Sequence, residues 1–152
     1  MTSLTDFLLA RVAEDEAAAR AASPGGWRFG DVESVAGGTL YDESRRIADI
    51  AYEQATDHDG SIVRHLLAPE ADANGEHIAR HDPARVLAEC EAKRRIVERH
   101  TIDCYPGDEG DEYVCDHCRA QGWHPADVLC PDLLDLASVY ADRPGYRAEW
   151  RP

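Results

Sequence analysis

The sequence predicts an α+β fold in a single domain of residues 1–152, and three observations lead to that prediction. Apolar residues recur at helical spacing near the N-terminus and in the centre of the chain. Between these two stretches the pattern changes to short extended runs separated by turn residues. Three of the five cysteines gather in residues 115–130, directly before a final helix. A chain of this length can bury a substantial core.

The N-terminal helix is expected at residues 3–22. Ser3 or Thr5 can accept hydrogen bonds from the free N–H groups of its first turn. Asp15 interrupts the apolar stripe, so the second half of the helix should be less buried. The Ser-Pro-Gly-Gly run at residues 23–26 ends the helix. The stripe itself consists of Leu4, Phe7, Leu8, Val12, Ala19 and Ala22.

A small antiparallel β-meander is expected at residues 27–51. Gly37 and Gly38 would form a bulge or a tight turn, and residues 42–45 a second turn. The three strands are expected at residues 27–29, 32–41 and 46–51.

Residues 52–75 are expected to be a variable insert. Within it, residues 61–68 form a short helix and residues 69–75 a mobile loop. Residues 76–100 then read as a short helix, a break and a long helix. Asp82 and Pro83 mark the start of the long helix, as an N-cap followed by proline. One stripe of this helix carries Val86, Cys90, Val97 and His100.

The zinc loop and the C-terminal helix occupy residues 101–152. An acidic loop at residues 101–114 leads to the cysteine segment, and a helix follows at residues 131–141. Tyr146 and Trp150 can dock the C-terminal tail on the body. Cys130 shares its side of the helix with Leu133, Leu134 and Ala137, so its sulfur should face the core.

The cysteine segment predicts a structural Zn²⁺ site. Cys115 and Cys118 form a Cys-x-x-Cys pair, and Cys130 supplies a third sulfur. We favour His100 as the fourth ligand, because it lies on the apolar face at the end of the long helix. Three other residues stay open for that position, namely Cys104, His124 and His117. Unligated or redox-active thiols are the alternative, but a thioredoxin-type motif is disfavoured because the pair is expected in a loop.

A second histidine pair, His77 and His81, has the i, i+4 spacing of HExxH metalloproteases. The glutamate that should follow the first histidine is replaced by Ile78, so the general base is missing. These histidines are expected to cap and pack the helix break. Cys90 on the core stripe is read as a small buried hydrophobe. The sequence therefore offers no catalytic residues and no cofactor other than zinc.

The charge of the chain restricts its partners. Thirty acidic residues against 16 basic ones give a formal charge of −14. Direct nucleic-acid binding is disfavoured, because it relies on Lys and Arg clusters. A basic protein partner suits such a surface, and so does mimicry of nucleic acid. We expect a cytoplasmic protein without membrane segments, because no apolar run approaches about 20 residues and no signal peptide is recognisable.

Three strings carry a resemblance to a known family: FLLARVAEDE, EHIARHDPARVLAECEAKRRIVERH and LASVYADRPGYRAEWRP. They resemble an uncharacterised family of small actinobacterial and actinophage proteins, over about two thirds of the chain. Members of that family also carry a Cys-x-x-Cys pair and a cysteine before the last helix. The resemblance implies a bacterial or phage origin and an accessory role, and it supplies no catalytic residues.

Together these observations predict a small acidic accessory protein, stabilised by zinc and acting by protein–protein binding rather than as an enzyme. Two alternatives remain open. The first is a metal-dependent hydrolase or nuclease, which would use an open zinc or the region of His77 and His81. The second is an acidic nucleic-acid mimic that inhibits a host DNA-binding protein.

Overall fold

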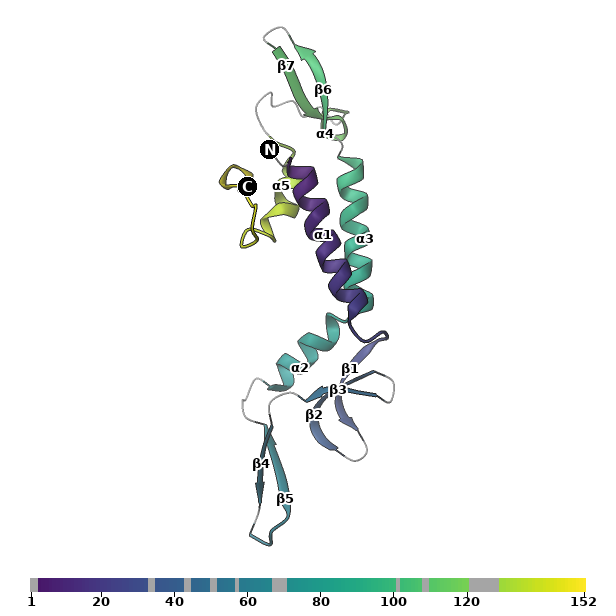
Figure 1. Cartoon of the computed structure of the whole chain (residues 1–152), viewed down its shortest axis with the longest axis vertical. Coiled ribbons are helices and arrows are strands. Elements are labelled where there is room, and N and C mark those ends of the chain that lie inside the picture. Colours follow the sequence, from purple (N-terminus) through teal and green to yellow (C-terminus); the bar gives the residue numbers. More distant parts are fainter. Residues whose placement is uncertain are drawn as a thin grey trace. The chain divides into compact units, whose positions relative to one another are not determined.

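The computed structural model describes residues 3–32, 35–42, 45–49, 52–56, 58–66, 71–100, 102–107, 110–120 and 129–152. The chain divides into two compact units (Figure 1). One unit contains Met1–Glu16 and Glu89–Pro152, and the other contains Ala17–Ala88. The predicted α+β class is confirmed, with an N-terminal helix, an antiparallel sheet, a long central helix and a C-terminal helix.

The N-terminal helix α1 runs from Leu4 to Ala21, close to the predicted bounds. Ser3 provides the predicted cap: its Oγ accepts the N–H of Asp6 at 3.0 Å, and the Asp6 carboxylate accepts the N–H of Ser3 at 3.4 Å. This reciprocal pairing satisfies backbone donors that the first turn would otherwise leave free. The predicted apolar stripe is buried at Leu4, Phe7, Leu8, Val12 and Ala19.

The predicted meander is present in the unit of residues 17–88. Strands β1 (Trp27–Val32), β2 (Val35–Asp42) and β3 (Arg45–Asp49) form an antiparallel sheet in that order. Trp27 pairs with Asp42, and Thr39 pairs with Asp49. The predicted bulge at Gly37 and Gly38 is confirmed: both lie inside β2, between the pairs Gly30–Thr39 and Val32–Val35 where the register shifts, and Gly38 has φ +73°.

Two predictions for residues 52–75 are wrong. The expected helix at 61–68 is strand β5 (Ile62–Leu66), which pairs with β4 (Tyr52–Thr56) as an antiparallel hairpin. β-Branched Ile62 and Val63 favour a strand. The turn before them is formed by Gly60 at φ +86° and by the Asp59 carboxylate, which accepts the N–H of Ser61 at 3.0 Å.

The expected loop at residues 69–75 belongs largely to helix α2 (Ala71–Arg80). Gly75 is buried, and a Cβ at this position would overlap the ring of Phe29 in β1. Glycine therefore lets the helix approach the sheet closely. Helix propensity counts against this residue, which explains why the sequence pattern suggested a loop.

The long helix α3 spans Pro83–Arg99. The Asp82 carboxylate accepts the N–H of Arg85 at 2.8 Å, so the predicted N-cap and proline start are confirmed. Cys90, Val97 and His100 are buried along the predicted stripe.

The acidic segment after α3 is a hairpin and not the predicted loop. Strands β6 (Ile102–Gly107) and β7 (Gly110–Cys115) pair antiparallel, with Ile102 opposite Cys115. Tyr105, Tyr113 and Val114 have strand-forming side chains, whereas the surrounding acidic residues conceal this preference in the sequence. The described residues after β7 contain the short helices α4 (Asp116–Ala120) and α5 (Pro131–Ser138) and the 3₁₀ helix η1 (Ala148–Trp150).

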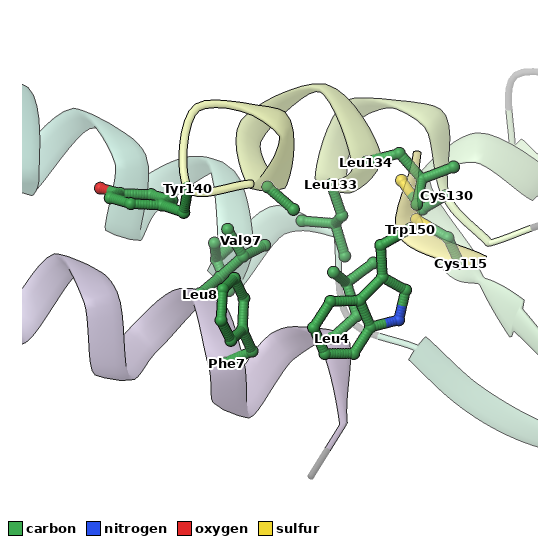
Figure 2. Close-up of a cluster of buried hydrophobic side chains, with 11 residues drawn as sticks. Leu4, Phe7, Leu8, Val97, Cys115, Cys130, Leu133, Leu134, Tyr140 and Trp150 are labelled. Carbon is green, nitrogen blue, oxygen red and sulfur yellow. The ribbon is translucent and has the colours of Figure 1, made fainter. Parts of the chain in front are cut away.

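The core of the unit formed by residues 1–16 and 89–152 joins α1, α3, α5 and the tail (Figure 2). Trp150 is 1% exposed, and its ring lies 5.0 Å from that of Phe7 and 5.9 Å from that of Tyr146. The predicted docking of the tail is therefore confirmed. The core also includes Cys115 and Cys130, which places the cysteine segment beside the main apolar cluster. Among the helices of the described ranges, none has the length and apolar character needed to cross a membrane.

Candidate metal centre

One histidine and three cysteines converge at the end of α3. His100 directly follows that helix, Cys115 is the last residue of β7, Cys118 lies in α4, and Cys130 immediately precedes α5. Their ligand atoms all lie within 4.8 Å of one another. These are the four residues that the sequence suggested as metal ligands, and the structure brings all of them together.

The spacing of the four ligand atoms fits a single tetrahedral metal ion. The Nδ1 atom of His100 lies 3.4 Å from the Cys115 sulfur, 3.7 Å from Cys118 and 3.3 Å from Cys130. The sulfurs of Cys118 and Cys130 are 3.6 Å apart. Zinc bonds of about 2.3 Å to sulfur and about 2.0 Å to nitrogen give tetrahedral edges of about 3.5 Å for S···N and about 3.8 Å for S···S. Ligands spread over the several irons of an iron–sulfur cluster would need wider separations.

The imidazole of His100 is oriented by a carboxylate. Its Nδ1 faces the three sulfurs, and its Nε2 lies 3.2 Å from the Asp132 carboxylate. A metal-binding histidine commonly donates its second N–H to such a group, which fixes the tautomer that leaves the other nitrogen free to ligate. Burial lowers the pKa of His100, and Asp132 opposes that effect. The neutral imidazole that a metal requires is therefore favoured near neutral pH.

The thiols are crowded; Cys115 and Cys130 are buried and Cys118 is half-buried. Burial, together with the hydrogen bonds that the Cys118 thiol donates toward Cys130 and Cys115, raises the pKa of Cys118 to about 12. Burial also raises the pKa of Cys130, although the backbone N–H of Leu133 in the first turn of α5 partly offsets this. Gathering thiolate charge in one buried place is costly unless a cation neutralises it. A divalent metal supplies that charge, so the same burial that opposes bare thiolates suits a metal–thiolate site.

The Cys-x-x-Cys pair spans a strand end and a short helix, and the prediction that it lies in a loop is wrong. The pair therefore does follow a strand, but that strand belongs to an antiparallel hairpin, and Cys130 and His100 close around the pair. Both features differ from a thioredoxin-type motif.

The other candidates for the fourth position can now be placed. His117 is half-buried, and its ring lies edge-on to that of His100 with centroids 4.7 Å apart, but it is not among the four converging ligands. The backbone of Cys104 pairs with Tyr113 in the β6–β7 hairpin, and the described structure does not extend to its side chain. His124 lies outside the described residues.

The second histidine pair has a different setting. His77 and His81 are both exposed, with ring centroids 4.3 Å apart. Nδ1 of His81 lies 2.9 Å from the carbonyl oxygen of His77, so this histidine caps the last turn of α2, whereas neither ring packs in a core. In the part of the chain that the structure describes, only the His100 cluster brings three or more His, Cys, Asp or Glu ligands together.

Sequence reasoning missed Asp132. It lies in the first turn of α5, two residues after Cys130, where an acidic residue is ordinary because it suits the helix dipole. Its contact with His100 joins residues 32 positions apart, and only the convergence of α3 and α5 reveals it. The nearest usable signal was its position beside a predicted metal ligand.

Comparison with known protein families gives one match. A model described as a family of unknown function (DUF6221) matches residues 1–152. No curated protein matches the chain. No solved structure matches it either.

Proposed function

Because the chain belongs over its whole length to this family, which has no known function, we infer its role from the site: we propose a zinc-stabilised accessory protein that acts by binding another protein. The observation that carries the zinc part is the closed set of three sulfurs and one imidazole nitrogen within 4.8 Å. Structural zinc sites use four protein ligands, whereas catalytic ones keep a position for water or substrate. A Cys₃His site of this kind stabilises a fold.

The positions of the ligands support a structural role. They come from the end of α3, the end of β7, α4 and the start of α5, so one ion would link four elements of the same unit. The short helices α4 and α5 have five and eight residues, and helices of that length are marginal without tertiary support. Zinc would supply that support directly.

The protein-binding part rests on charge and on the lack of a catalytic arrangement among the described residues. A formal charge of −14 favours a basic partner surface over nucleic acid. The small accessory role, the actinobacterial or phage origin and the cytoplasmic location belong to this proposal, and the family resemblance supports the first two.

A metal-dependent hydrolase or nuclease is less well supported by the geometry. All four ligands at the cluster come from the protein, and His77 and His81 have no third ligand beside them among the described residues. Nothing about the site favours nucleic-acid mimicry over a protein partner.

The proposal is tested on the purified full chain by metal analysis and thermal unfolding, before and after chelation. We expect one zinc per chain, and chelation should abolish cooperative unfolding because metal-binding free energy is folding free energy. The assignment of a structural zinc would be overturned if the chain folds equally well without metal, or if the metal carries a water molecule that inhibitors displace. Affinity capture from a nuclease-treated bacterial lysate tests the partner, with salt titration to remove non-specific ionic binding.

A further inference from the structure

We propose that a groove beside the metal centre binds a short peptide segment of a partner protein, one that carries a large apolar side chain flanked by Lys or Arg. This inference rests on the proposed protein-binding function and names the surface and chemistry of that binding. The groove has a volume of about 690 Å³ and lies wholly within the unit of residues 1–16 and 89–152. That volume is in the usual range for sites that bind a small ligand or a side-chain anchor.

The floor of the groove is apolar. Leu4, Val97 and Trp150 line it, and each is at most 4% exposed, so these side chains are held rigidly in the core (Figure 2). Leu9 lies on α1 at the groove and is 37% exposed, which makes it one of the large apolar side chains that the described surface leaves to solvent. A rigid floor with an accessible apolar wall is the arrangement that receives an aliphatic or aromatic anchor.

The rim of the groove is acidic. Asp6, Glu98 and Glu149 line it, and among the described residues of the groove only Arg147 is basic. Arg147 is already committed: its guanidinium lies 2.6 Å from the Glu149 carboxylate and 5.3 Å from the centre of the Trp150 ring. The rim therefore keeps a net negative charge around an apolar floor. Complementary charge selects a partner with basic residues beside its apolar anchor.

The same charge argues against a second copy of this chain as the occupant. Two acidic rims would face each other across a symmetric interface, and the chain as a whole carries a charge of −14. Like charges brought together in this way oppose association. A basic peptide gains from the same field.

The metal ligands are adjacent to residues of the groove. Leu129 lines the groove and directly precedes Cys130, and Val97 lies three residues before His100. Loss of the metal would therefore disturb the groove, so peptide binding should require zinc.

The test uses the zinc-loaded full chain and fluorescently labelled seven-residue peptides, measured by anisotropy. The first set has a central Trp, Phe or Leu between arginines; two matched sets replace the arginines by glutamates or the central residue by Ala. We expect the first set to bind at least ten-fold more tightly than either matched set. Binding of the first set should weaken as salt rises. Equal binding of all three sets, or no binding of any, would overturn the proposal.

Two pairs of variants locate the binding. Leu9→Asp should weaken binding at least ten-fold, whereas Val139→Asp, which alters a 63% exposed apolar residue away from the groove, should not. Glu98→Gln should weaken binding several-fold and reduce its salt dependence, whereas Glu91→Gln, an exposed position on the same helix, should change neither. Equal effects within each pair would overturn the groove as the site.

The outcomes separate this inference from the proposed function. If the wild type and Leu9→Asp capture the same partner protein equally well from lysate, the groove is not the binding site, but the proposed protein-binding function is supported. A chain that captures no protein at all would remove both. If the wild type is a dimer in solution and Leu9→Asp converts it to a monomer, the occupant of the groove is a second copy of the chain and the peptide proposal is overturned.

Discussion

The two histidine sites of this protein differ in everything except residue type. His77 and His81 are one helical turn apart, exposed, and in contact mainly with each other. His100 is 3% exposed, faces three sulfurs from later segments and contacts a carboxylate through its second nitrogen. Regular spacing in the sequence marks the first site, whereas convergence of distant segments marks the second. A metal site needs several ligands at once, and burial alone makes an unoccupied set costly.

The largest expected effect comes from replacing a cysteine ligand of the metal centre, with replacement of His77 or His81 as the comparison. Cys130→Ser and Cys115→Ser should abolish stoichiometric zinc binding and cooperative unfolding of the unit that carries them. Structural zinc contributes on the order of 10 kcal/mol to the folding of small domains, so no other local change should cost as much. Zinc analysis and circular dichroism melting measure both effects. Matched His77→Ala and His81→Ala variants should keep their zinc; loss of zinc in these variants would reverse the comparison.

Smaller losses in the free energy of unfolding are expected when Trp150 in one unit and Trp27 in the other are replaced by alanine. Trp150 is 1% exposed beside the metal-bearing core, so Trp150→Ala should cost about 3–5 kcal/mol in the free energy of unfolding. Trp27 is half-buried, and its Nε1 donates to the carbonyl oxygen of Ser23 at 3.1 Å. Trp27→Ala should cost less, about 1–2 kcal/mol. Urea unfolding of the zinc-loaded protein compares them, and a larger loss for Trp27→Ala would contradict the assignment of the main core.

Asp132 sharpens the account of His100. Asp132→Asn removes the charge that orients the imidazole and should lower zinc affinity about 10–100-fold, as is usual for such supporting carboxylates. Competition with a colorimetric chelator measures the change. Asp135→Asn is the matched control, because it changes an exposed aspartate of the same helix. If both variants bind zinc equally well, Asp132 has no positioning role.

The fold was predictable wherever local pattern and tertiary packing agree. The stripe of α1 and the Asp82 cap of α3 follow from spacing and side-chain chemistry alone. The hairpins β4–β5 and β6–β7 were missed for different reasons. The short apolar run at residues 61–68 fits a helix as well as a strand, and the acidic residues of 101–114 conceal the strand-forming ones. The start of helix α2 was missed, because glycine has a low helix propensity. Only the structure shows that Gly75 is needed there to leave room for the Phe29 ring.

Long-range hydrogen bonds between polar side chains could not be anticipated. Asp15 reads as an interruption of the apolar stripe, yet its carboxylate accepts a hydrogen bond from the Tyr140 hydroxyl at 2.7 Å, and Lys93 donates to the same hydroxyl at 2.9 Å. For the candidate site, cysteine spacing identified three ligands, and the helical stripe favoured His100 over its rivals. The contact between Asp132 and His100 depends on how α3 and α5 meet, and the position of Asp132 beside Cys130 was its only signal in the sequence.

The smallest expected effect is at the exposed histidine pair. The double variant His77→Ala/His81→Ala removes a side-chain cap on α2 and two exposed rings, so the free energy of unfolding should change by no more than about 0.5–1 kcal/mol. Urea unfolding at neutral pH measures it. A loss of several kcal/mol would mean that the pair does more than end a helix.

X-ray absorption at the zinc edge of the loaded full chain tests the central claim most directly. A Cys₃His site predicts three sulfur neighbours at about 2.3 Å, one nitrogen at about 2.0 Å and no further ligand. His100→Cys should convert the spectrum to four sulfurs, which would identify the nitrogen. Two or fewer sulfur neighbours, or an oxygen from bound water in the first shell, would contradict the closed site around His100, Cys115, Cys118 and Cys130.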